Sequence, residues 1–210
     1  RESYLQQLFS VKDIPDIKVI TGVRRSGKSK LMDAFHNSIS SEENNIIHIK
    51  LNLKQNEVLA NADNLYDYVC KNYKAEKNNY LLIDEIQMCN GFEKVINSLY
   101  EEERFDIYLT GSNAFLLSSD LATLFGGRVF EIKVFPFSFK EFMLYFPSDD
   151  LDKSFDEYMK KGGMAGSYLY RTEEDSFKYI ESIVKATIIR DIDSKYKIEN
   201  ENLLQMIYEF

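Results

Sequence analysis

One eight-residue stretch, Gly22–Ser29, constrains this chain more than any other part of its sequence. It reads Gly-Val-Arg-Arg-Ser-Gly-Lys-Ser and fits the phosphate-binding loop pattern G-x-x-x-x-G-K-[ST] at every fixed position. The glycines let the backbone turn so that successive N–H groups point at phosphate oxygens. The lysine reaches the β- and γ-phosphates, and the last serine hydroxyl is placed to hold Mg²⁺. We therefore expect nucleotide-binding residues at Gly22, Val23, Arg24, Arg25, Ser26, Gly27, Lys28, Ser29 and Lys30.

The residues on either side of the motif predict the strand and the helix that such a loop requires. Asp16–Thr21 is rich in β-branched residues and reads as a short strand. Lys30–Phe35 continues as a helix, whose positive N-terminal dipole favours an anion at the loop. This context favours the phosphate-binding interpretation over an accidental match.

An apolar strand, Tyr80–Glu85, ends in two carboxylates. A continuous apolar strand is typical of a central parallel sheet, because helices cover both of its faces. Ligands bind at the C-terminal ends of such strands. We expect Asp84 to hold the water shell of Mg²⁺ and Glu85 to polarise the attacking water. Two acids at this position also cap helices, so the catalytic interpretation depends on the upstream loop.

A further predicted strand, Phe105–Asn113, has polar residues at its tip. We expect Thr110, Ser112 or Asn113 to sense the γ-phosphate. A helix N-cap at Ser112 or Asn113 explains those two residues almost as well.

The alternation of strands and helices predicts an α/β fold, a three-layer P-loop NTPase sandwich with a five-stranded parallel sheet. From about Phe137 the pattern becomes helical, which indicates a small helical lid. We therefore assign residues 1–136 to a P-loop ATPase core and residues 137–210 to the lid and the start of a truncated C-terminal region. The chain begins without Met and stops inside a helical pattern, which favours a fragment of a longer protein.

Composition excludes several classes of protein. Hydrophobic residues make up 44%, enough for a packed core, and a formal charge of −8 argues against a broad nucleic-acid-binding surface, though not a local one. No apolar run is long enough to cross a bilayer and no signal-peptide pattern is present, so we expect no membrane partner. Cys70 and Cys89 lack C-x-x-C spacing, which is typical of buried thiols in the reducing cytoplasm. His36 and His48 are too isolated in the sequence to suggest a metal site.

Together the motifs resemble those of the prokaryotic AAA-type ATPases whose C-terminal half is a domain of unknown function. The family's Gly-x-Arg-Arg-x-Gly-Lys-Ser loop, Asp-Glu-Ile-Gln strand end, Thr-Gly-Ser tip and Gly-Arg pair are matched by Gly22–Ser29, Asp84–Gln87, Thr110–Ser112 and Gly127–Arg128. Its most specific signature matches Pro136–Phe142, and two further matches are Arg190–Ile192 and Tyr196. One departure follows Gly162–Gly163, where the family commonly has an apolar residue and then Pro, whereas Met164 and Ala165 stand here.

The resemblance implies ATP and Mg²⁺ as ligands, with Ser29 and Asp84 at the metal. Related ATPases commonly present an arginine to the γ-phosphate of a neighbouring subunit, which implies a homo-oligomer with a catalytic Arg128. A salt bridge from Arg128 to an acid such as Glu131 is the alternative. The family's C-terminal segments are missing from this sequence, and we expect DNA or protein as their partner.

The function that we expect is a Mg²⁺-dependent ATPase that couples hydrolysis to conformational change, with Glu85, Arg128, Thr110 and Ser112 as catalytic residues. A nucleotide-gated binding switch with little turnover and a small-molecule kinase remain as alternatives. Glu85 beside Asp84 favours activation of water over transfer to an acceptor molecule.

Overall fold

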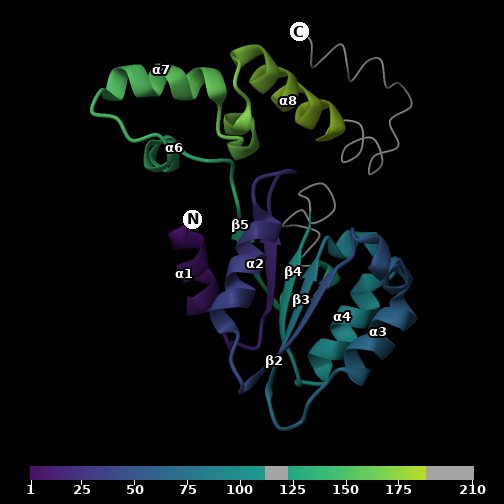
Figure 1. Ribbon diagram of the computed structural model, residues 1–210. Helices are drawn as coiled ribbons and strands as arrows, with labels where there is room; N and C mark the ends of the chain where they lie inside the picture. The colour runs from purple at the N-terminus through teal and green to yellow at the C-terminus, as the bar shows by residue number, and fades with distance from the viewer. Residues whose placement is uncertain (112–122, 188–210) are drawn as a thin grey trace. The chain divides into compact units, whose positions relative to one another are not determined.

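A computed structural model describes residues 1–111 and 123–187, which contain a five-stranded parallel β-sheet followed along the chain by helices (Figure 1). The strand order is β2-β3-β4-β1-β5, and each neighbouring pair is parallel. The strands are β1 (Ile17–Thr21), β2 (Asn44–Lys50), β3 (Asn78–Asp84), β4 (Asp106–Thr110) and β5 (Val129–Lys133). The prediction of an α/β fold with a five-stranded parallel sheet is confirmed.

Helices precede, connect and follow the strands. Among the residues up to β5 they are α1 (Glu2–Ser10), α2 (Lys28–Ile39), η1 (Lys54–Ala60), α3 (Ala62–Lys71), η2 (Ile86–Met88) and α4 (Phe92–Glu101). After β5 they are α6 (Phe139–Tyr145), α7 (Leu151–Lys161), η3 (Ala165–Leu169) and α8 (Glu173–Ala186). No helix in residues 1–111 and 123–187 is both long and apolar enough to cross a membrane.

Of the other elements that the sequence predicts, one ends earlier in the structure and one lies largely outside the described residues. The sequence predicts a second strand over Ile46–Leu53. In the structure this strand ends at Lys50, because the Leu53 N–H donates to the Lys50 carbonyl oxygen at 3.1 Å and closes a turn. The sequence also predicts a helix through Leu121 and Leu124 that ends at Gly126–Gly127, and this helix lies largely outside the described residues.

Alternate residues of each strand face two different apolar layers, as the pleat of a strand requires. On β3, Leu81 and Ile83 belong to the layer that includes α3 and α4, whereas Tyr80 and Leu82 belong to the layer that includes α1 and α2. Figure 1 shows these two pairs of helices on opposite faces of the sheet. Burial on both faces explains why β3 reads as an unbroken apolar run.

The parallel arrangement brings the carboxyl ends of the strands to one edge of the sheet. Gly22 follows β1 directly, Asp84 ends β3 and Thr110 ends β4. In the register of the sheet, Ile20 of β1 pairs with Thr110. The sheet therefore places the beginning of the Gly22–Ser29 loop beside the tip of β4, at the edge where α/β sheets bind ligands.

Contacts divide the chain into two compact units. The first, here called the sheet unit, comprises Arg1–Gly22 and Lys28–Val134. The second, the helical unit, comprises Val23–Gly27 and the chain from Phe135 onward. The middle of the loop therefore groups with the helices that follow the sheet in sequence.

The helical unit has its own aromatic core. Ser138 caps α6 by accepting a hydrogen bond from the Glu141 N–H at 3.3 Å, and the Glu141 carboxylate accepts one from the Ser138 N–H at 2.9 Å. Phe142, one residue further, is fully buried. Its ring centroid lies 4.9–5.5 Å from those of Phe146, Tyr158 and Tyr168. The Pro136–Phe142 signature thus encodes the start of α6 and its core contact.

Candidate functional site

The glycine loop, Gly22–Ser29, joins β1 to α2 and contains three residues with positive φ. Gly22 has φ 149° and Gly27 has φ 101°, values that residues with a Cβ rarely adopt. Arg25 has φ 61°, the left-handed conformation that costs a non-glycine residue free energy. Strain of this kind persists where the surroundings impose it, and it concentrates at functional sites.

Two lysines at the start of α2 have opposite surroundings. The Lys28 residue is 4% exposed, and its Nζ donates to the Gly22 carbonyl oxygen at 2.8 Å. The Lys30 side chain is 90% exposed, with its Nζ 4.0 Å from the Asp33 carboxylate. A buried ammonium beside the loop is suited to phosphate oxygens. We therefore expect the Lys28 side chain, but only the backbone N–H of Lys30, to take part in binding.

Three oxygen-bearing side chains from α2, β3 and β4 meet at the carboxyl edge of the sheet. The Ser29 hydroxyl donates to Asp84 Oδ1 at 3.1 Å, and the Thr110 hydroxyl donates to the same oxygen. Asp84 is 1% exposed and Thr110 is fully buried. Two hydroxyl donors hold this carboxylate in place without neutralising its charge.

The Mg²⁺ that the resemblance implies fits this arrangement. Mg²⁺ prefers oxygen ligands, keeps several waters and takes one or two protein ligands together with substrate phosphates. Ser29 Oγ and the Asp84 carboxylate supply such a pair. Within residues 1–111 and 123–187, no group of three or more His, Cys, Asp and Glu side chains could hold a metal. The donor set therefore suits Mg²⁺ bound with a phosphate ligand.

Glu85 follows Asp84 in a left-handed conformation, with φ 58° and ψ 50°. Its N–H donates to Thr110 Oγ1 at 3.0 Å. Its carboxylate accepts a hydrogen bond from the amide of Gln87, a residue of the family motif for which the sequence alone predicts no role. The signal in the sequence that could have identified this contact is a polar residue, Gln87, two positions after Glu85. The strand end thus presents Glu85 in a fixed backbone and side-chain orientation.

Arg128 does not join these residues. Its carbonyl oxygen accepts a hydrogen bond from the Ile17 N–H at 2.9 Å, which places it at the amino end of β1, whereas the glycine loop follows the carboxyl end. Its guanidinium pairs with Glu101, rather than with Glu131 as the alternative expected, and lies 5.1 Å from the Tyr100 ring centroid. Ser112 and Asn113 lie outside the described residues.

A histidine pair lies between α2 and β2. His36 Nδ1 and His48 Nδ1 are 2.8 Å apart, so these two residues, which stand apart in the sequence, are in contact in the structure. Burial, followed by repulsion from His36 and Lys50, lowers the pKa of His48 below its usual value. The two residues are distant in sequence, and the packing of α2 on the sheet brings them together.

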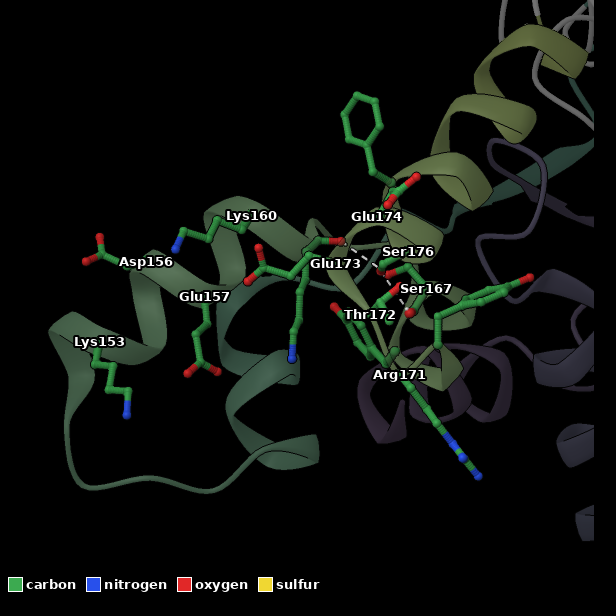
Figure 2. Close-up of a pocket in the computed structure, with 14 residues that line it drawn as sticks. Lys153, Asp156, Glu157, Lys160, Ser167, Arg171, Thr172, Glu173, Glu174 and Ser176 are labelled. Atoms are coloured by element: carbon green, nitrogen blue, oxygen red, sulfur yellow. Dashed lines mark hydrogen bonds between the residues drawn. The ribbon is translucent and has the colours of Figure 1, made fainter.

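A cavity of about 840 Å³ lies within the helical unit, between α7 and the start of α8 (Figure 2). Its lining includes four basic and four acidic residues, namely Lys153, Lys160, Lys161, Arg171, Asp156, Glu157, Glu173 and Glu174. The Ser176 hydroxyl donates to the Ser167 carbonyl oxygen at 2.9 Å at its edge (Figure 2). None of the predicted site residues lines this cavity, and its mixed charge favours no single class of ligand.

Comparisons with known proteins agree with the fold and with the family that the chain resembles. A model of the AAA domain family matches residues 15–143. An uncharacterized protein of Haemophilus influenzae is 35% identical, with 100% of this chain and 54% of the relative covered. An uncharacterized protein of Methanocaldococcus jannaschii is 29% identical, with 91% and 45% covered. The chain therefore spans about half the length of these relatives.

The fold is also similar to that of a solved structure. The S. cerevisiae Hsp104:casein complex in its extended conformation matches with a TM-score of 0.51 at 14% identity, covering 91% of this chain and 38% of that chain. Likeness at this identity supports the fold alone. The family model, in contrast, matches more than half of the sequence. The chain belongs to the AAA domain family, within the prokaryotic AAA-type P-loop ATPases that its motifs resemble.

Proposed function

We propose that the chain is a Mg²⁺-dependent ATPase that couples ATP hydrolysis to a change of conformation. The observation that carries this proposal is the arrangement around Thr110, whose hydroxyl contacts both Asp84 and the Glu85 N–H. Ser29 reaches the same Asp84 oxygen at 3.1 Å. Membership of the AAA domain family supports ATP as the nucleotide.

Phosphate binding is assigned to the glycine loop and Lys28. The backbone N–H groups of Val23–Gly27 donate to phosphate oxygens, and the N-terminus of α2 adds its positive dipole. The Lys28 ammonium then exchanges its bond to the Gly22 carbonyl oxygen for bonds to phosphate. Bound Mg²⁺ supplies positive charge next to the phosphates, and Ser29 and Asp84 are the residues that would hold it.

Hydrolysis is assigned to Glu85. Its carboxylate accepts a proton from water as the water oxygen bonds to the γ-phosphorus and the bridging β–γ oxygen leaves with ADP. Thr110 acts by positioning Asp84 and Glu85. Ser112 remains a proposed γ-phosphate sensor. Arg128 is proposed to act across a homo-oligomer interface, and DNA or protein is the proposed partner of the longer relatives' remaining sequence.

A nucleotide-gated switch with little turnover is the second candidate. The Gln87 amide donates to the Glu85 carboxylate, so one acceptor position of that carboxylate is occupied before a water molecule reaches it. Both candidates bind ATP. Steady-state phosphate release by the full-length protein separates them, because only the ATPase releases phosphate in repeated turnovers.

The binding assignment is tested at Lys28. In the Lys28→Ala variant, phosphate loses a charge-assisted hydrogen-bond donor, and we expect ATP affinity to fall about tenfold to a hundredfold. Titration calorimetry with ATP and Mg²⁺ measures this change. Lys94→Ala is the matched control, because Lys94 is exposed on α4. Equal affinities of the Lys28→Ala variant and the wild type would exclude the binding role.

A further inference from the structure

Arg25 of the glycine loop contacts Tyr179 of α8. The guanidinium carbon lies 5.0 Å from the centroid of the Tyr179 ring, within the range of a cation–π interaction. Both residues belong to the helical unit, which contains Val23–Gly27 and the chain from Phe135 onward. A residue of the glycine loop thus contacts a helix near the end of the described chain.

The backbone of Arg25 adopts a conformation that glycine would adopt at a lower cost in free energy. The Ser26 N–H donates to the Val23 carbonyl oxygen at 3.2 Å, so Arg25 is the third residue of a four-residue turn. A turn with positive φ at its third position favours Gly or Asn. Arg25 has φ 61° at that position. The Arg25 side chain therefore stands at a position with a conformational cost, which points to a role for the guanidinium.

Tyr179 is itself held in place by its neighbours. A Cβ on Gly166 would lie 2.0 Å from the Tyr179 hydroxyl oxygen and 2.6 Å from Cζ, so the ring occupies space that only glycine leaves open. The Tyr170 ring lies 5.3 Å away, centroid to centroid. The ring under the guanidinium is thus held by contacts of α8 with η3 and with Tyr170, the residue that follows η3.

We propose that the Arg25 guanidinium binds either the nucleotide phosphates or the Tyr179 ring. Bound nucleotide then displaces the guanidinium from the ring and destabilises α8. This inference rests on the proposed function, because it requires nucleotide at the glycine loop. A charge-assisted hydrogen bond from a guanidinium to phosphate is stronger than its contact with the half-buried Tyr179 ring. The guanidinium therefore binds phosphate in preference to the ring, and α8 loses one of the contacts that stabilise it.

Thermodynamic linkage between nucleotide binding and the Arg25–Tyr179 contact predicts the direction of a second effect, a change in nucleotide affinity. If nucleotide weakens the Arg25–Tyr179 contact, then loss of that contact must strengthen nucleotide binding. A cation–π contact at an exposed site corresponds to about a twofold to fivefold change in affinity. We expect the Tyr179→Leu variant to bind ATP more tightly by this factor. A purely structural role for Tyr179 would weaken binding or leave it unchanged.

The experiment is hydrogen–deuterium exchange of α8 in the full-length protein, with and without ATP and Mg²⁺, together with calorimetric ATP affinities. In the wild type, ATP should raise the exchange rate of α8. In Tyr179→Leu and in Gly166→Ala, which displaces the ring without changing either partner, exchange should be fast already and insensitive to ATP. Phe177→Leu is the matched control, since Phe177 lies on the same helix and is 67% exposed. It should behave as the wild type.

Arg25→Gly keeps the turn and removes the guanidinium, so it serves as a control for misfolding of the other variants. Without ATP, its α8 should exchange as fast as in Tyr179→Leu, and the double variant should exchange no faster than either single variant. Additive effects would overturn the proposal. Wild-type ATP binding without any change in α8 exchange would also overturn it, while leaving the proposed function intact. Absence of ATP binding in the wild type would contradict both.

Discussion

Glu85 adopts a backbone conformation that costs a non-glycine residue about 1–3 kcal/mol, and three contacts account for it. The Glu85 N–H donates to Thr110 Oγ1, and the Thr110 hydroxyl donates to Asp84. The Gln87 amide then fixes the carboxylate. Because the orientation is set before any ligand binds, the proposed activation of a water molecule by Glu85 would need little reorganisation.

The division of roles between the two acids predicts different phenotypes. Glu85→Gln should retain ATP affinity and lose hydrolysis by a factor of about 10²–10⁴, because an amide cannot accept the proton. Asp84→Asn should instead weaken the dependence of ATP binding on Mg²⁺. Phosphate release and calorimetry at several Mg²⁺ concentrations measure both effects. Gln87→Leu is a useful comparison, because it keeps both acids and removes only the donor to Glu85. Identical binding and turnover in the Asp84 and Glu85 variants would contradict this assignment.

At the scale of the elements, the sequence predicts those features that have a local cause. The apolar run of β3 reflects burial on both faces, and the glycine loop identifies β1 and α2. The end of β2 was placed too late, because Leu51 is buried like a strand residue although it lies in a turn. Contacts between distant segments carry no local signal. The Thr110–Asp84 bond and the Arg25–Tyr179 contact therefore became visible only in the structure.

The contact between α2 and β2 predicts a pH dependence of stability. Its basis is the lowered pKa of His48, which burial and the neighbouring His36 and Lys50 cause, while Asp33 and Asp84 act in the opposite direction. Below the ordinary value of 6.5 the unfolded chain binds a proton that the folded chain resists, so stability falls as pH decreases through this window. Each kcal/mol lost lowers the melting temperature by about 2–4 °C in a chain of this size.

Melting temperatures between pH 7.5 and pH 5 provide the measurement. The wild type should lose the most stability, His36→Gln less and His48→Gln least, because the first substitution removes one cause of the shift and the second removes the group itself. The chain has two histidines, which makes this comparison complete for that residue type. Parallel melting curves for all three proteins would show that the pair does not control the pH response.

At the scale of the whole molecule, the two compact units divide the glycine loop. Gly22 and Lys28 belong to the sheet unit, and Val23–Gly27 belong to the helical unit. The loop therefore contains residues of both units, and a change in its conformation reaches both of them through the continuity of the chain. Arg128 is a different case, because within residues 1–111 and 123–187 its side chain contacts Glu101 and Tyr100 rather than the loop. It lies at the amino end of β5, and the four residue steps of β1 from Ile17 to Thr21 correspond to roughly 13 Å.

A role of Arg128 in hydrolysis therefore requires a second copy of the chain. A guanidinium supplied in trans to the γ-phosphate is worth a factor of about 10³–10⁵ in rate in other NTPases. We expect Arg128→Ala to bind ATP normally and to hydrolyse it far more slowly. Arg128→Lys should be nearly as slow, because the planar fork is lost. Mixing Arg128→Ala with Glu85→Gln should restore activity, since one interface then combines an intact Glu85 with an intact Arg128.

The ion pair with Glu101 provides the control for a structural role. The two side chains are 47% and 64% exposed, and an exposed pair of this kind contributes about 0–1 kcal/mol to stability. Glu101→Gln breaks the pair but keeps the guanidinium, so hydrolysis should persist if Arg128 acts on a neighbouring subunit. If Arg128 serves only to hold α4 against the start of β5, Glu101→Gln should reproduce the defect of Arg128→Ala. In that case mixing the Arg128→Ala and Glu85→Gln proteins, with assembly followed by light scattering, should recover no activity at any ratio.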